Sequence, residues 1–388
     1  MKRAALAASL ALILAGCGGP SSTNNTQAQA PPSAALKQRA FITNQNAAGG
    51  LANGLIDVID ASVDRLVFVL TTGGTPSMMV LSPDKKTLAV FDSATNALQV
   101  IDVAKQSVTG SAGLGDIARS IAYLSDNVTV LAALRNSGQV AFVSSTDGTI
   151  ATNVAVPAVR TLVPSHSTSK VLAFNDVSRD TFHIIDISGK AATAVTNAAL
   201  DFPIYGVFSS DDSKAYILSC GAECGGTTAK VSVLDVAAGT ISQTVTVSAA
   251  TTALLDGTRL YVAGTQGTAG RLDVVDVGTM TVSTRGVAIS DGFHQVMALG
   301  SNNRLYIGAR TCNNVTTGCL TIYNTSSNTA TVDTPHGDVT GLQPITGRNV
   351  MYVIEGGELR IMQTTNDAEQ SFPIIDIVGR AFDVKLVE

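Results

Sequence analysis

The chain has 388 residues and a formal net charge of −5, only 14% of its residues are charged, and it contains no tryptophan. Gly, Ala, Ser, Thr and Val dominate, as expected for short strands joined by tight turns. No basic patch or basic tail appears, so we expect no nucleic-acid partner.

The first residues have the features of an export segment. Lys2 and Arg3 make a short basic start, and residues 4–15 are apolar, which suits a signal peptide and is short for a membrane span. This stretch ends in Leu-Ala-Gly-Cys at residues 14–17. Residues 18–37 contain almost no large apolar side chain, so we expect a flexible tether before a folded body.

The Leu-Ala-Gly-Cys segment resembles the lipobox of bacterial lipoproteins. The resemblance implies that residues 1–16 are a signal peptide, that Cys17 carries the lipid, that residues 17–37 form the tether and that residues 38–388 form one domain. Gly18 follows Cys17, which resembles the outer-membrane type of Gram-negative lipoproteins. The expected location is therefore the bacterial cell envelope, on the periplasmic side of the outer membrane in a Gram-negative host. The alternative is an ordinary signal peptide with an incidental cysteine.

Short apolar runs recur along the rest of the chain. They lie at 56–60, 98–102, 140–144, 182–186, 231–235, 272–276, 320–324 and 359–363. The last residues of successive runs are 39 to 49 positions apart, with three intervals of 42. A period near 40 with strand-like content is typical of a β-propeller, so we predict an all-β, eight-bladed propeller. Seven blades is the alternative if the unit around 140–144 or 359–363 is incomplete.

Each unit contains candidates for four strands, which we name A to D from the hub outward. Most of the recurring runs are C strands that close on Asp or Asn, as at Asp102, Asp186 and Asp235. Such side chains accept backbone N–H bonds in the following turn, so we interpret them as structural rather than catalytic.

One A strand is missing from the start of the repeat. Unit 1 begins at its B strand near Ala40, whereas an extra segment at 381–387 follows the last predicted D strand, residues 371–378. We predict that this C-terminal segment is strand A of blade 1 and closes the ring, because closure removes exposed strand edges.

Residues 81–90 read Leu-Ser-Pro-Asp-Lys-Lys-Thr-Leu-Ala-Val, and residues 96–102 continue Asn-Ala-Leu-Gln-Val-Ile-Asp. Together with residues 209–217, they resemble the YVTN-type repeat of bacterial propellers. Proteins with this repeat include surface, periplasmic and enzymatic members, so the resemblance implies the fold and leaves the activity open.

Four cysteines remain when Cys17 is set aside. They form two local pairs, Cys220 with Cys224 and Cys312 with Cys319, and each pair follows a B strand in one of the two long intervals. We predict two disulfides that restrain long B–C loops in an oxidising compartment. The rival interpretation is a metal site that shares all four cysteines, although their spacing is poor for zinc.

The B–C and D–A loops of a propeller emerge on the same face, and the long loop at 44–54 adds to the two that carry cysteines. Polar residues of the D–A loops are candidates for binding at the mouth of the central channel. They are Asp116, Arg119, Asp201, Asp291, His294, His336, Asp338 and Arg380, with Arg160 nearby in sequence. One interpretation is a site for a cation or a basic or polar group. The other is that each Asp accepts turn amides and the arginines balance the charge.

Three functions are compatible with these features. The first is a lipid-anchored, monomeric, non-enzymatic module that binds an envelope protein, peptide or glycan through its loop-rich face. The second is a hydrolase similar to lactonase-type propellers, with a site at the channel mouth. The third is a structural role in a surface layer. The sequence has no G-x-S-x-G and no C-x-x-C-H, and we predict no catalytic residue, metal or cofactor.

Overall fold

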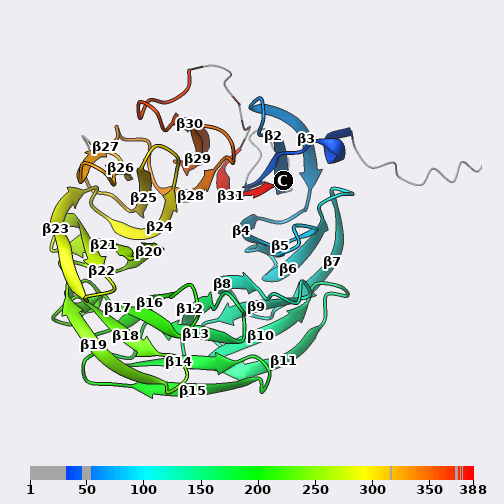
Figure 1. Cartoon of the computed structure of the whole chain (residues 1–388). Coiled ribbons are helices and arrows are strands. Elements are labelled where there is room, and N and C mark those ends of the chain that lie inside the picture. The colour runs from blue at the N-terminus through cyan, green and yellow to red at the C-terminus, as the bar shows by residue number, and fades with distance from the viewer. Residues whose placement is uncertain (1–31, 46–53, 315–316, 372–374, 376, 378) are drawn as a thin grey trace, which may run out of the picture.

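The computed structural model of the protein describes residues 32–45, 54–314, 317–371, 375, 377 and 379–388. Eight antiparallel sheets surround a central channel as blades (Figure 1). Each sequence period corresponds to one blade. The predicted all-β, eight-bladed propeller is therefore confirmed, and the seven-bladed alternative is wrong.

The strands of blades 1 to 8 occupy four positions between the hub and the rim. The A strands are β31 (Ala381–Val387), β4 (Pro76–Leu81), β8 (Ala118–Tyr123), β12 (Val159–Pro164), β16 (Pro203–Phe208), β20 (Thr252–Asp256), β24 (Phe293–Leu299) and β28 (Val339–Pro344). The B strands are β1 (Arg39–Asn44), β5 (Thr87–Asp92), β9 (Thr129–Leu134), β13 (Lys170–Asn175), β17 (Lys214–Ser219), β21 (Arg259–Gln266), β25 (Arg304–Arg310) and β29 (Val350–Glu355).

The outer half of each blade follows the same order. The C strands are β2 (Leu55–Asp60), β6 (Ala97–Asp102), β10 (Gln139–Ser144), β14 (Thr181–Asp186), β18 (Lys230–Asp235), β22 (Ala269–Asp276), β26 (Leu320–Asn324) and β30 (Glu358–Gln363). The D strands of blades 1 to 7 are β3 (Arg65–Thr71), β7 (Ser107–Gly113), β11 (Ile150–Ala155), β15 (Ala191–Thr196), β19 (Thr240–Thr246), β23 (Thr281–Ile289) and β27 (Thr329–Val332). Two short 3-10 helices are η1 (Pro32–Ala35) and η2 (Gly221–Cys224).

Some predictions fall on residues outside the described ranges. These are the signal peptide, the lipid attachment at Cys17, most of the tether and most of the loop at 44–54. The predicted D strand of blade 8, residues 371–378, also lies largely outside them. Within the described part of the chain, no helix has the length and apolar character needed to cross a membrane.

The apolar core lies between neighbouring blades rather than within them. Phe91 and Leu98 of blade 2, for example, pack in one buried cluster with Tyr123 and Val130 of blade 3. Both faces of the inner strands are covered, which explains why their sequences are apolar at most positions instead of alternating. A single blade cannot bury its own apolar faces, so the repeat is stable only as a ring.

The closing residues of the C strands have the predicted structural role. Asp186 accepts a hydrogen bond from the backbone N–H of Gly189 at 2.8 Å, and Asp235 accepts one from that of Ala238 at 2.9 Å. Asn324 does the same for Ser326 at 2.9 Å. These carboxylates and amides stabilise the C–D turns at the rim, far from the channel.

The two ends of the ring are joined in blade 1. Strand β31 pairs antiparallel with β1, with Ile42 opposite Val384, so the C-terminal segment supplies the missing A strand as predicted. A second link connects blade 8 to blade 1, where Arg348 donates to the Asp64 carboxylate at 2.7 Å. The side chain of Asp64 is only 2% exposed, so this ion pair is shielded from solvent.

Candidate functional site

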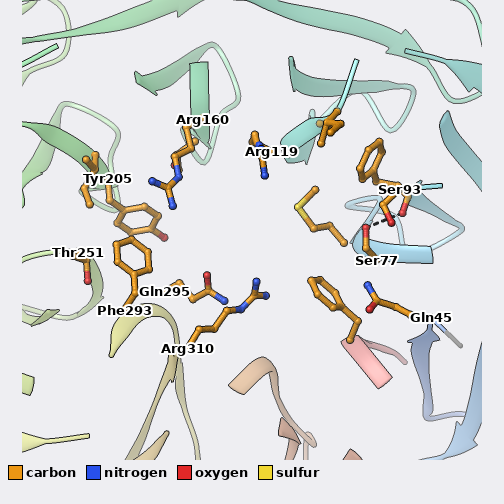
Figure 2. Close-up of a pocket in the computed structure, with 17 residues that line it drawn as sticks. Gln45, Ser77, Ser93, Arg119, Arg160, Tyr205, Thr251, Phe293, Gln295 and Arg310 are labelled. Carbon is orange, nitrogen blue, oxygen red and sulfur yellow. Dashed lines mark hydrogen bonds between the residues drawn. The ribbon is translucent and has the colours of Figure 1, made fainter. Parts of the chain in front are cut away.

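A cavity of about 460 Å³ occupies the channel at the face that carries the B–C and D–A loops (Figure 2). Gln45 and Ser93 reach it from B–C loops, and Ile117 reaches it from a D–A loop. The first residues of several A strands complete the wall. The volume lies in the range of about 300–1,000 Å³ that is usual for small-molecule sites.

β-Bulges at the start of the A strands aim side chains into this cavity. In seven of the eight blades strand A has one residue more than strand B near the loop-rich end, so the register between them shifts by one. An extra residue in one strand bends it and redirects its side chain. The skipped positions include Phe382, Met78, Arg119, Arg160, Ile204, Gln295 and Thr340, and all of these except Thr340 line the cavity.

Three arginines from different blades share the cavity. Arg119 and Arg160 occupy the bulges of β8 and β12, and Arg310 is the last residue of β25. Within the described ranges, none of the three forms a salt bridge, and the residues that line the cavity include no Asp or Glu. Burial lowers the pKa of Arg310, and the more distant Asp338 and Asp383 oppose this shift. Because guanidinium groups stay protonated in proteins, the cavity carries net positive charge.

Aromatic rings hold two of these arginines in place. The Arg160 guanidinium lies 5.3 Å from the centre of the Phe293 ring, and that of Arg310 lies 5.0 Å from the centre of Phe382. The side-chain amide of Gln295 lies beside Arg310, and its oxygen accepts a hydrogen bond at 3.0 Å in the orientation that satisfies both groups. The cationic groups are thus positioned by cation–π contacts and an amide rather than by carboxylates.

Tyr205 adds a phenol beside Phe293 (Figure 2). Burial raises the pKa of this phenol, so its hydroxyl stays protonated at neutral pH. A protonated hydroxyl can donate or accept a hydrogen bond. It can therefore serve as an additional polar contact for a bound molecule.

The predicted aspartates of the D–A loops lie around the cavity but do not line it. Asp201 accepts hydrogen bonds from the backbone N–H groups of Thr227 and Thr228 at 2.7 and 2.8 Å, and from Arg179 at 3.0 Å. Asp116 accepts one from the backbone of Ser137 at 2.7 Å. In each case the carboxylate connects a D–A loop to a B–C loop.

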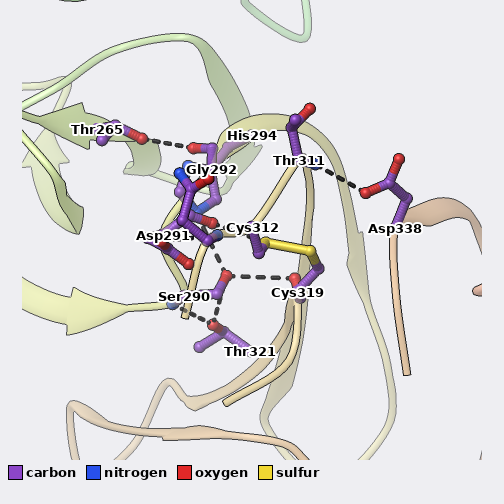
Figure 3. The surroundings of a disulfide bond; sticks show 11 residues. Thr265, Ser290, Asp291, Gly292, His294, Thr311, Cys312, Cys319, Thr321 and Asp338 are labelled. Atoms are coloured by element: carbon purple, nitrogen blue, oxygen red, sulfur yellow. Dashed lines mark hydrogen bonds between the residues drawn. A yellow bond between two sulfur atoms is a disulfide. The ribbon is translucent and has the colours of Figure 1, made fainter. Parts of the chain in front are cut away.

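Asp291 and Asp338 make the same kind of connection in blades 7 and 8. Asp291 accepts from the backbone N–H of Asn313 at 3.0 Å, and Asp338 accepts from that of Thr311 at 2.7 Å (Figure 3). The four carboxylates therefore stabilise the loop-rich face. This arrangement matches the interpretation in which the aspartates accept turn amides.

Most of the other predicted site residues also lie outside the cavity wall. His294 is fully buried, and this burial lowers its pKa to about 4, so its ring is neutral. His336 lies 3.0 Å from the hydroxyl of Thr334, and the backbone N–H of Arg380 donates to Asn44 at 2.9 Å. Among the predicted channel-mouth residues, Arg119 lines the cavity, as does Arg160.

Sequence reasoning missed Tyr205, Phe293, Gln295, Arg310 and Phe382. Arg310 was missed because it is the last residue of a B strand, β25, whereas the sequence pointed only to residues of the D–A loops. The other four are near the starts of A strands, where Gln295 and Phe382 occupy bulges, and a bulge leaves no recognisable pattern in a single sequence. One feature of the sequence could have indicated the cavity. Arg119 and Arg160 occupy the same position in successive repeats, each as the second residue of its A strand.

Both predicted disulfides are present, Cys220–Cys224 and Cys312–Cys319, each with a Cα–Cα distance of 5.7 Å. The second closes the loop that directly follows Arg310 (Figure 3). The first encloses Glu223, which accepts a hydrogen bond from the backbone N–H of Thr265 in blade 6 at 2.7 Å. In the described part of the chain, no group of three or more His, Cys, Asp or Glu residues is placed to hold a metal ion.

No protein-family model matches the chain. No curated protein matches its sequence. Several solved structures share its fold. Hydrazine synthase of Kuenenia stuttgartiensis has a TM-score of 0.58 at 14% identity, over 75% of this chain and 96% of that chain.

The dihydro-heme d1 dehydrogenase NirN, solved in complex with DHE, has a TM-score of 0.69 at 11% identity, over 90% of this chain and 75% of that chain. The propeller domain of Cps50 (Swd1) of Myceliophteria thermophila has a TM-score of 0.55 at 12% identity, over 73% of this chain and 95% of that chain. At such low identities, the likeness shows a common propeller fold and assigns no activity.

Proposed function

We propose that this chain is a non-enzymatic binding module of the bacterial cell envelope that holds an acidic ligand at the mouth of its channel. The observation that carries the proposal is the convergence of Arg119, Arg160 and Arg310 on one cavity without carboxylate partners among the described residues. Guanidinium groups without carboxylate partners on a rigid scaffold are well suited to bind carboxylates. The ligand is an acidic group of a protein, peptide or glycan.

The anchoring part of the proposal rests on the sequence. The lipobox-like segment supports lipid attachment at Cys17, and residues 18–37 have the composition of a tether between membrane and propeller. The two disulfides fit an oxidising compartment such as the periplasm. The YVTN-like segments are compatible with this location, since such repeats occur in periplasmic and surface proteins.

The geometry favours binding over hydrolysis. A lactonase-like mechanism requires an activated base or nucleophile that faces the cavity. The described residues of the wall include no histidine or carboxylate, and the hydroxyls of Ser77 and Ser93 donate to backbone carbonyl groups. The nearby aspartates are engaged with backbone N–H groups, and His294 is buried beneath the surface. Among propellers of similar fold, NirN was solved with a bound molecule, DHE, which supports the capacity of this fold to hold a ligand.

A pull-down from envelope extract tests this function. The soluble body, residues 32–388, is compared with a variant that carries Arg119→Gln, Arg160→Gln and Arg310→Gln. A control variant carries Arg65→Gln, Arg271→Gln and Arg285→Gln, which change the net charge by the same amount outside the cavity wall. We expect the wild-type and control proteins to capture the same partner and the cavity variant to lose it. Equal capture by all three proteins would contradict the proposal.

A further inference from the structure

The three arginines enter the cavity from opposite sides of the ring. Arg119 and Arg160 belong to the adjacent blades 3 and 4, and Arg310 belongs to blade 7, four blades from blade 3. In a ring of eight blades, a separation of four is the opposite position. Figure 2 shows Arg310 facing the other two across the cavity. The cavity therefore has two positive poles.

Each pole has donors that are ready to bind a planar anion. Arg160 and Arg310 stack on Phe293 and Phe382, at 5.3 and 5.0 Å from the ring centres. A guanidinium held in this way keeps its N–H donors in its own plane, where two of them can bind the two oxygens of one carboxylate. The amide of Gln295 lies beside Arg310 and adds a further polar group at that pole.

The wall of the cavity is mixed, with hydroxyl and amide groups beside aromatic and thioether side chains. Tyr205 and Phe293 lie together on one side (Figure 2), and Met78, Phe91 and Phe382 also line the cavity. Aromatic and thioether side chains favour contact with hydrocarbon or ring surfaces. A ligand that reaches both poles therefore meets charge at its two ends and, between them, ring surfaces together with hydroxyl groups.

Electrostatics favours a ligand with two anionic ends. Guanidinium groups do not lose their protons, and Asp338 and Asp383 only partly offset the desolvation of Arg310, so a bound anion adds compensation that the wall itself does not supply. A single carboxylate compensates one pole and leaves the other unpaired. One molecule with two carboxylates compensates both, and it loses its translational and rotational freedom only once.

Building on the function proposed above, we propose that the group recognised by the cavity is an organic dicarboxylate. One carboxylate binds Arg119 and Arg160, the other binds Arg310 and the Gln295 amide, and the segment between them contacts Tyr205, Phe293 and Phe382.

Isothermal titration calorimetry on the purified protein tests this inference. The probes are linear dicarboxylates from succinate to suberate and the rigid terephthalate. Three comparison probes are used. Hexanoate carries one carboxylate, adipamide is uncharged, and inorganic phosphate is a single compact anion. We expect at least one dicarboxylate to bind about ten-fold or more tightly than hexanoate, and adipamide not to bind.

Single substitutions test whether Arg310 forms the second positive pole. Arg310→Gln is expected to reduce dicarboxylate affinity to the level of hexanoate, while hexanoate still binds at Arg119 and Arg160. Arg310→Lys keeps the charge but loses the two-pronged geometry, so we expect an intermediate affinity. Arg285→Gln, on the exposed strand β23, is the matched control and is expected to bind like the wild type. Thermal melting of each variant checks that the ring is intact.

Three results would overturn the inference. The first is equal affinity for hexanoate or phosphate and for the dicarboxylates, which would indicate a single anion-binding pole and leave the broader binding function in place. The second is unchanged dicarboxylate affinity in Arg310→Gln. The third is no binding of any probe. In that case, arginine-dependent capture of an envelope partner in the pull-down would still support the proposed function, so the two failures are distinguishable.

Discussion

Charged residues at the loop-rich face have two distinct roles. The aspartates are engaged with backbone N–H groups of neighbouring loops, as Asp201 is with Thr227 and Thr228. Two arginines of the cavity, Arg160 and Arg310, instead stack on aromatic rings and keep donors available. Carboxylates thus hold the loops together, and guanidinium groups provide the binding chemistry. The two roles can be separated by substitution.

The lowered pKa of Asp201 predicts that acid reduces the stability of the loop-rich face. Its burial acts to raise the pKa, but hydrogen bonds from Thr228, Thr227 and Arg179 outweigh burial and lower the pKa to about 2. The unfolded carboxyl has a pKa near its model value of 3.8, so its contribution to stability is present above that value and is lost as pH falls towards 2. Asp201→Asn should lower the free energy of unfolding at pH 7 by about 1–3 kcal/mol. Urea unfolding at pH 7 and pH 3 measures this, and a wild-type-minus-variant difference that does not shrink at pH 3 would contradict it.

The raised pKa of Glu223 predicts that stability depends on pH in the opposite direction. Burial raises its pKa to about 7, and the hydrogen bonds from Thr265 only partly oppose this. The folded protein therefore binds a proton more tightly here than the unfolded chain, and stability falls as pH rises from about 4.5 to 7. Glu223→Gln should remove this component. We expect the difference in melting temperature between wild type and variant to change between pH 5 and pH 8, and a constant difference would argue against the shift.

At the level of elements, the A-strand bulges and the B–C loops together build the site. The bulges of β8 and β12 direct Arg119 and Arg160 inward, and the end of β25 supplies Arg310. The loop after β25 is restrained twice, by Cys312–Cys319 and by the hydrogen bond from Thr311 to Asp338. This restraint fixes the backbone next to Arg310.

The two disulfides should therefore differ in their effect on binding. Each closes a short loop, so removal of either pair by Cys→Ser substitution should cost at most about 2–3 kcal/mol of stability. Loss of Cys312–Cys319 should also weaken ligand binding, because Arg310 immediately precedes that loop. Loss of Cys220–Cys224 should weaken it less, since that pair adjoins no arginine of the cavity wall. Calorimetry and thermal melting of the two double variants test this, and equal binding losses would contradict it.

At the scale of the whole molecule, stability depends on closure of the ring. Blade 1 takes its A strand from the C-terminus, and the cluster between blades 8 and 1 contains Ile42, Tyr352 and Val384. Arg348 and Asp64 add a shielded ion pair across the same junction. The C-terminal strand β31 is thus required to complete blade 1, which begins with the N-terminal strand β1.

Deletion of residues 380–388 should destabilise the entire propeller rather than one blade. The deletion removes β31, exposes the edge of β1 and opens the interface between blades 8 and 1. Val384→Asp places a charge in the same buried position and should act in the same direction. Calorimetric melting measures the effect, and an unchanged melting temperature in the truncated chain would contradict the closure.

The architecture was predictable from the sequence, whereas the site was predictable only in part. Apolar runs with a period near 40 indicated the blades, and the absence of an A strand before Ala40 indicated how the ring closes. The cavity wall depends on register shifts of one residue, which change the direction of a side chain without changing composition. For this reason Gln295 and Phe382, which occupy bulges, were not found, whereas Arg119 was found because it lies beside the D–A loop that contains Asp116.

The most direct test of the binding site is arginine labelling with phenylglyoxal, read residue by residue by mass spectrometry, in the free protein and in the complex captured from envelope extract. We expect Arg119, Arg160 and Arg310 to react in the free protein and to be protected in the complex. Arg65 and Arg285, on the outer strands β3 and β23, should react equally in both. Equal labelling of the three cavity arginines in both states would show that the ligand binds elsewhere.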